Sequence, residues 1–439
     1  MAPGNPLLKG KTKGHTNNPS GSNGSNNGTW PEEDILKASL HQYAAEQLRQ
    51  SERLQRLLKD HGLIISQALL KKLNRHFEVP TSRKPPPEDQ AAQLVLEKMG
   101  DDGGGRRGPA TIKTVLALEG HHIPRRLVRQ VMRDNDDDGM NKHFPGARKI
   151  RRTALKSLGV FQEVNGDGHA KLDEQALRMG AGLGLPIYGL RDKFSGAILW
   201  LVVVPNDRLA VTIGHVYCDF IEAYGAIPLQ LTVDKGSETG NMFAMQCGLR
   251  KAYAPELDNN QYPAFAALKS VHNTVIESCW KWLRDNRGVT LAEEVRHGQD
   301  DGILQAGIPL HVSLFRWLWP KVLQVELDAF TEYWNSHRIR SQAAKTMPSG
   351  AVPSHVFRCP EDFGGERLAV PVPKDAIDAL RADLPTSREE CMRWVSDNFD
   401  IAAEVVYEQI GKPQFSVTTA WAVFELMLAK LAVTVVPED

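Results

Sequence analysis

From about residue 161 onward, short apolar runs alternate with amphipathic stretches, a pattern that predicts strands alternating with helices. The segments 187–191 and 197–204 are expected to form a hairpin that turns at residues 193–196. Because 197–204 is almost uniformly apolar, we expect it to be a central strand buried on both faces. The runs expected to form strands are 160–164, 187–191, 197–204, 229–233 and 264–268.

Helical periodicity fills the gaps between these strands. One apolar face carries Ile213, Val216, Phe220 and Tyr224, and further helices are expected at 241–253 and 273–286. The resulting order is β-β-β-α-β-α-β-α, which is the order of the ribonuclease H-like fold. The sequence therefore predicts an α/β domain with a five-stranded mixed sheet and flanking helices.

The front half of the chain has a helical pattern. Residues 1–29 are rich in Gly, Asn, Ser and Pro and are expected to be disordered. Ser66 is a suitable N-cap, and Pro85, Pro86 and Pro87 mark a linker. The segments expected to form helices are 31–59, 67–77, 88–99, 110–119 and 124–134.

The last two of these helices, separated by a tight turn, have the pattern of a helix-turn-helix. The second helix carries arginines that could contact phosphates and base edges, namely Arg125, Arg126, Arg129 and Arg133. A solvated helix face explains the same arginines equally well. The stretch 142–156 adds a second candidate for phosphate binding through Arg148, Lys149, Arg151 and Arg152.

The charge distribution agrees with a DNA-binding front half. The formal net charge of the chain is +0, but residues 1–160 carry +10 and residues 161–439 carry −10. Chance segregation of surface charge is the alternative. The five cysteines are scattered and indicate reduced thiols, and no apolar run is long enough to span a membrane. We therefore expect an intracellular, nuclear protein, although Lys9, Lys11 and Lys13 are too sparse to define a nuclear signal.

Three acidic residues lie at the edges of different predicted elements. Asp167 stands between two glycines, Asp234 follows a strand, and Glu277 lies in a helix. Two of them have a structural alternative: Asp167 suits a turn, and Glu277 could pair with Lys281 one helical turn away. In a ribonuclease H-like unit these positions meet at one edge, so we expect the carboxylates to converge on divalent cations. Asp192 is expected only to cap the hairpin turn.

The motifs around these acids resemble those of the integrase core domain of the retroviral integrase and DDE transposase superfamily, particularly the stand-alone integrase-core proteins of fungi. Asp167-Gly168-His169 with Lys171-Leu172 is similar to the first motif, and Asp234-x-Gly236-x-Glu238 to the second. Ser270-x-x-Asn273-x-x-Ile276-Glu277-x-x-Trp280 is similar to the third. The chain departs from the usual pattern at four positions, which are Val164, Thr239, Val275 and Ser278.

The resemblance implies a DNA-binding polynucleotidyl transferase that cleaves and joins strands, with Asp167, Asp234 and Glu277 as catalytic ligands of two Mg²⁺ or Mn²⁺ ions. It implies auxiliary roles for His169, Glu238 and Asn273. Double-stranded DNA is the expected partner, homo-oligomerisation is possible, and neither a membrane nor an organic cofactor is expected. One alternative is a domesticated, catalytically inactive DNA-binding or assembly protein, because two family arginines are absent at 275 and 278. Another is a nuclease of the same fold that acts on RNA–DNA hybrids.

These expectations divide the chain into a disordered tail, a helical region, a helix-turn-helix-like region, an integrase core and a small accessory region. The expected boundaries are 1–29, 31–84, 85–150, 155–358 and 367–439, respectively. Within the last region, helices are expected near 386–398 and 418–431.

Overall fold

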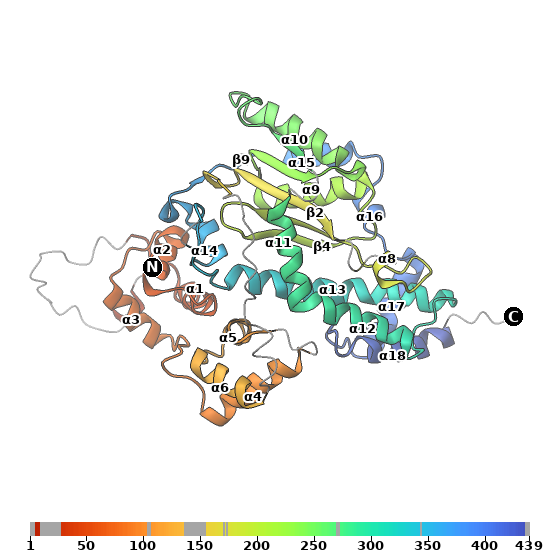
Figure 1. Cartoon of the computed structure of the whole chain (residues 1–439), viewed down its shortest axis with the longest axis horizontal. Coiled ribbons are helices and arrows are strands. Elements are labelled where there is room, and N and C mark those ends of the chain that lie inside the picture. The colour runs from red at the N-terminus through yellow and green to blue at the C-terminus, as the bar shows by residue number, and fades with distance from the viewer. Residues whose placement is uncertain are drawn as a thin grey trace, which may run out of the picture. The chain divides into compact units, whose positions relative to one another are not determined.

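The computed structural model describes residues 5–8, 28–102, 107–135, 155–169, 172, 174–268, 273–342 and 345–434. The chain divides into two compact units, shown in Figure 1. The first comprises Met1–Lys156 and Tyr333–Gly365, and the second comprises Ser157–Glu332 and Glu366–Asp439. No helix in the described part of the chain is long and apolar enough to cross a membrane.

The first unit begins with helices packed around one core. These are α1 (Glu33–Ala45), α2 (Gln50–His61) and α3 (Gln67–His76). The single helix predicted over 31–59 is wrong, because Gln47 adopts a left-handed backbone conformation with φ 55° and the chain turns there. The turn places the apolar residues of both halves, such as Leu40 and Leu57, in a single core. One straight helix would spread the same residues over different faces.

The predicted ends of the third helix are confirmed. Oγ of Ser66 accepts a hydrogen bond of 3.2 Å from the backbone nitrogen of Leu69, as an N-cap does. Gly62 ends α2 in the left-handed conformation. Val352, which directly precedes α14 (Pro353–Arg358), belongs to the same core, so the 333–365 segment completes this unit.

A second core joins the next three helices, all of which were predicted. They are α4 (Glu88–Gly100), α5 (Pro109–Leu118) and α6 (Arg125–Asn135). Ile112, Leu116, Val128 and Val131 are among the residues buried between them. The packing of α6 through Val128 and Val131 leaves its arginines on the opposite, exposed face.

The second unit is built on a five-stranded mixed sheet in the order β4-β3-β2-β6-β7. Strand β2 pairs antiparallel with β3 and parallel with β6, β3 pairs antiparallel with β4, and β6 pairs parallel with β7. The strands are β2 (Glu163–His169), β3 (Ile187–Asp192), β4 (Ile198–Val203), β6 (Gln230–Asp234) and β7 (Phe265–Leu268). The topology is ribonuclease H-like, as the sequence predicts.

Two strand predictions are corrected by this sheet. The run 197–204 is an edge strand, not a central one, because β4 pairs only with β3 among the described strands. Its apolar character follows from burial, because no residue of β4 is exposed. At the edge of the strand, Gln324 of helix α13 (Pro309–Ser336) hydrogen bonds the backbone of Val203 and Leu201. The strand predicted at 160–164 extends instead to His169, so Asp167 lies within β2.

Helices cover both faces of the sheet. Trp280 of α11 (Thr274–Leu283) packs over Gly189, and the Tyr188 hydroxyl is 3.4 Å from Sδ of Met242 in α10 (Gly240–Tyr253). Because neighbouring residues of a strand face opposite sides, α11 and α10 lie on opposite faces. Helix α9 (Ala210–Tyr224) packs against α10. A π-helix, Arg284–Gly288, joins α11 to α12 (Val289–Asp300).

The C-terminal segment packs within the second unit. Its helices are α15 (Lys374–Ala382), α16 (Arg388–Cys391), α17 (Asp397–Gln409) and α18 (Ala420–Thr434). A helix at 386–398 was predicted wrongly, because Ser396 caps a new helix and accepts a hydrogen bond from the nitrogen of Phe399. Trp421 of α18 lies against Gly298, and its ring centroid is 4.9 Å from that of Trp319. Trp317 donates a hydrogen bond of 2.8 Å to Asp400.

Candidate metal centre

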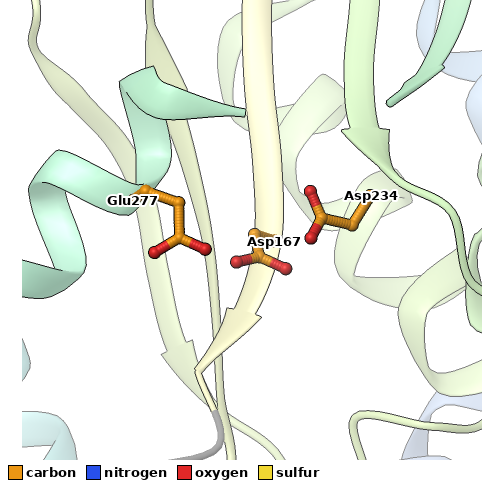
Figure 2. Close-up of side chains that lie close together, drawn as sticks. All are labelled: Asp167, Asp234 and Glu277. Carbon is orange, nitrogen blue, oxygen red and sulfur yellow. The ribbon is translucent and has the colours of Figure 1, made fainter. Parts of the chain in front are cut away.

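The three acidic residues singled out in the sequence lie together. One carboxylate oxygen from each of Asp167, Asp234 and Glu277 lies within 4.8 Å of the others. Figure 2 shows Asp167 between the other two, with Asp234 on one side and Glu277 on the other. The three side chains come from β2, β6 and α11, so the site requires the folded sheet and its covering helix.

Asp167 lies within a paired strand, and the turn interpretation of its flanking glycines is therefore wrong. It is opposite Gly189 of β3. A Cβ atom at Gly189 would lie 2.6 Å from Cη2 of Trp280, so glycine makes room for this indole. Nε1 of Trp280 donates a hydrogen bond of 2.9 Å to Oδ2 of Asp167. In the sequence, Trp280 is marked only by its place in the third motif.

Asp234 is the last residue of β6 and is fixed by an amide. The fully buried Asn273 donates hydrogen bonds of 3.0 Å to Oδ1 of Asp234 and 3.1 Å to the carbonyl of Gly166. Its own Oδ1 accepts a bond of 3.0 Å from Asn165. Asn273 thus connects β2, β6 and the start of α11. Of the two carboxylate oxygens of Asp234, Asn273 contacts only Oδ1. The other oxygen, Oδ2, is therefore available as a metal ligand.

Glu277 occupies the first turn of α11, where its side chain is exposed and directed toward Asp167 (Figure 2). Among the described side chains, Lys281 forms no ion pair with Glu277, so the helix-partner interpretation receives no support. The buried Arg191 fixes this helix by donating to the Val275 carbonyl at 2.7 Å and to Oγ of Ser278 at 2.6 Å.

The cluster is electrostatically costly without a cation. Burial, together with the negative charges of Asp234 and Glu277, raises the pKa of Asp167 to about 7, although the hydrogen bond from Trp280 opposes the shift. The pKa of the buried Tyr188 is also raised, first by burial and then by a ring of acids that includes Asp167 and Asp207. Such a concentration of negative charge favours a positive ligand.

The remaining acids and the histidine surround this centre differently. The His169 ring stacks on Trp280 with a centroid distance of 4.7 Å. Glu238 follows β6 in a short 3-10 turn and contributes to the field at Tyr188. Asp207, which sequence reasoning missed, lies beside Gly168. Asp192 is fully buried and accepts hydrogen bonds from Ser195 and Phe161, so its predicted role as a turn cap is confirmed.

The donor set suits Mg²⁺ or Mn²⁺. Hard divalent cations take carboxylate oxygens and keep positions for water and phosphate, and three converging carboxylates provide such a set. Among the described residues, the cluster includes no cysteine or histidine, the ligands that would favour a softer metal. The exposure of Glu277 leaves one side of the cluster accessible.

The candidate DNA-binding residues lie in the first unit. Four arginines of α6 are exposed, namely Arg125, Arg126, Arg129 and Arg133. The second basic group, Arg148, Lys149, Arg151 and Arg152, falls outside the described residues. The structure therefore presents one of the two predicted basic surfaces.

Comparisons with known proteins agree with the fold and the motif order. Residues 176–356 match the family profile of an integrase core domain. This span contains Asp234 and Glu277 but begins after Asp167. The matched region is therefore similar to an integrase core domain.

Among solved structures, the chain is similar to the Mos1 strand transfer complex, with 12% identity over 62% of this chain and 98% of that chain, at a TM-score of 0.15. It is also similar to the Mos1 transposase paired-end complex with left transposon end, with 11% identity over 62% and 96% and a TM-score of 0.15. A comparison with curated proteins gives no match.

Proposed function

We propose that the protein is a metal-dependent polynucleotidyl transferase that cleaves and joins DNA strands. The observation that supports this most strongly is the convergence of Asp167, Asp234 and Glu277 within 4.8 Å on the ribonuclease H-like sheet of an integrase core domain. The catalytic core would lie within Ser157–Glu332 of the second unit, and residues 85–150 of the first unit would bind duplex DNA through α6.

The carboxylates of Asp167, Asp234 and Glu277 would hold Mg²⁺ or Mn²⁺, and Asp167 lies between the other two. When bound, such ions lower the pKa of a nucleophilic water or hydroxyl and stabilise the departing oxygen. The reaction is an in-line displacement in which an oxygen of water or of a DNA 3′ end bonds to phosphorus while the bond to the leaving 3′ oxygen breaks.

Positioning residues would keep this geometry. Asn273 sets the orientation of Asp234, and Trp280 sets that of Asp167. His169 would support the indole by stacking on it. Positions 275 and 278 hold Val275 and Ser278 where the family usually has arginine. Phosphate contacts beside Glu277 would therefore be weaker, because arginine binds phosphate oxygens through two donors.

The test uses the full-length protein with supercoiled plasmid DNA, in Mg²⁺, in Mn²⁺ and in a chelator. We expect nicked circles only with a divalent cation and none from a variant that combines Asp167→Asn, Asp234→Asn and Glu277→Gln. Wild-type protein that binds plasmid but breaks no more strands than this triple variant would refute the proposal and favour the inactive DNA-binding alternative. Preferential cleavage of a labelled RNA–DNA hybrid would favour the nuclease alternative.

A further inference from the structure

A small polar cavity in the first unit collects basic side chains from separate elements. Its volume is about 190 Å³, room for about six water molecules at roughly 30 Å³ each. Arg53 enters it from α2, Lys113 from α5 and His122 from the turn before α6. The hydroxyl-bearing Thr81 and Ser82 also line it. The cavity thus contains hydrogen-bond donors and groups that are or can become cationic.

No acid balances these groups among the residues that the structure describes. Nε of Arg53 donates 3.0 Å to the Leu48 carbonyl, and Nζ of Lys113 donates to Oε1 of Gln47, but neither side chain forms an ion pair with a described carboxylate. Elsewhere in the same unit, buried arginine is paired: Arg56 contacts Glu46 and Asp60, each at 3.1 Å. The absence of pairing at Arg53 and Lys113 is therefore a local feature of this cavity.

The three basic side chains of the cavity have lowered pKa values. Burial lowers the pKa of Arg53 and of Lys113, and the charge of Arg125 lowers the latter further. Burial, followed by the charges of Arg53 and Lys113, lowers the pKa of His122 to about 4. Buried charge without a partner is destabilising, and a bound anion would relieve it.

We propose that this cavity binds a phosphate group. Arg53, Lys113, His122 and the two hydroxyl groups all line one space, and each of them can donate a hydrogen bond to a tetrahedral anion. Two sources share this chemistry: a phosphodiester of bound DNA and a free phosphate. The influence of Arg125, the first exposed arginine of α6, connects the cavity with the proposed DNA-binding face. Only the DNA source depends on the proposed function.

The first experiment measures phosphate binding alone. The thermal midpoint of the full-length protein is followed while inorganic phosphate replaces chloride at constant ionic strength. We expect a saturable rise for the wild type and at least a tenfold weaker response for Lys113→Met and for Arg53→Gln. The matched controls Lys72→Met and Arg75→Gln, exposed on α3, should respond as the wild type does.

The thermal midpoint without phosphate distinguishes a structural role of Lys113 from an anion-binding role. If Lys113 merely supported the fold, Lys113→Met would lower the phosphate-free thermal midpoint; if it holds an anion, removal of the unpaired charge should raise or preserve the midpoint while the phosphate response is lost. A wild-type protein that shows no saturable response, or a Lys113→Met variant that responds fully, overturns the proposal.

The second experiment separates the two sources by fluorescence anisotropy with a labelled DNA duplex. If the phosphate belongs to DNA, Lys113→Met and Arg53→Gln should weaken duplex binding, and inorganic phosphate should compete at constant ionic strength. If it is a free phosphate, the variants lose the phosphate response but bind DNA as the wild type does. Wild-type protein that binds phosphate but no duplex contradicts the proposed DNA binding and leaves the phosphate site supported.

Discussion

Trp280 donates its indole hydrogen bond directly to Asp167, at 2.9 Å, so the third motif positions the acid of the first. The two residues lie on different elements, α11 and β2, and the bond crosses the face of the sheet. Gly189 provides the space for this contact. The centre therefore depends on a packing relationship as well as on its three carboxylates.

Replacement of Trp280 by phenylalanine should preserve the ring but remove the donor. We expect metal-dependent strand cleavage to fall about 10- to 100-fold, the range typical when a residue that orients a metal ligand is lost. The loss should appear largely as a higher Mg²⁺ requirement, measured by titration of the cation. Trp282→Phe, at a tryptophan of the same helix that is 46% exposed, is the control and should retain activity. Equal behaviour of both variants would contradict the positioning role.

A methyl group at Gly189 should also disrupt the hydrogen bond between Trp280 and Asp167, because it would displace the indole. In Gly189→Ala the new Cβ would lie 2.6 Å from Cη2 of Trp280, closer than such atoms approach, so the indole must move away from Asp167. We expect cleavage to decrease and the stability to fall by about 1–3 kcal/mol, as overpacking usually costs. Combining this change with Trp280→Phe should add little further loss of activity. Full additivity in a double-mutant cycle would argue against a shared mechanism.

The three acids should each be essential for catalysis without being needed for folding. Asp167→Asn, Asp234→Asn and Glu277→Gln keep size but remove a charge that would hold the cation, so cleavage should disappear in each. Because the charges repel one another, Asp167→Asn should also raise the metal-free thermal midpoint by a few degrees. Glu293→Gln, an exposed acid of α12, is the control. Retained activity in Glu277→Gln would remove that residue from the proposed centre.

The exposed arginines of α6 should determine the salt dependence of DNA binding. Each phosphate contact contributes about 0.9 to the slope of the logarithm of affinity against the logarithm of salt. Replacing Arg125, Arg126 and Arg129 by glutamine should therefore flatten the slope by about two to three. The whole chain is needed for this test, because 333–365 completes the first unit.

The control for this experiment removes an equal number of exposed charges from α3, through Lys71→Gln, Lys72→Gln and Arg75→Gln. A slope that decreases equally in both triple variants would indicate that α6 makes no specific contact.

Acidification should destabilise the protein through His355. Burial lowers the pKa of this fully buried histidine to about 4 from its ordinary value near 6.5. Between these values the unfolded chain binds more protons than the folded one, so stability is complete above about pH 6.5 and falls as pH decreases toward 4. From pH 7 to 5 we expect a loss on the order of 2 kcal/mol from this group.

Denaturant titrations at the two pH values measure this loss. His355→Gln can still donate to Gln55, as Nε2 of His355 does at 3.2 Å, and should reduce the pH dependence. His297→Gln, at a histidine whose side chain is 59% exposed, should not. An unchanged dependence in His355→Gln would assign the acid sensitivity to other groups.

The sequence predicts the sheet and the convergence of the acids because strand order and motif spacing are local properties. It misplaces the strand 197–204 because an edge strand without exposed side chains has the same apolar composition as a central strand. The joint role of Trp280 and Gly189 has no local signal, since the two residues are far apart in the chain and meet only after folding. Asp207 was missed for the same reason.

Trp421 packs against Gly298, so residues of the C-terminal segment contribute to the core of the second unit. The integrase core match stops at residue 356, yet Trp317 and Trp319 make contacts with Asp400 and Trp421 beyond that point. A protein shortened at the end of the family match would thus expose large indole surfaces to water and would tend to aggregate. Loss of activity in such a truncation would report on misfolding, and only point substitutions can assign the chemistry.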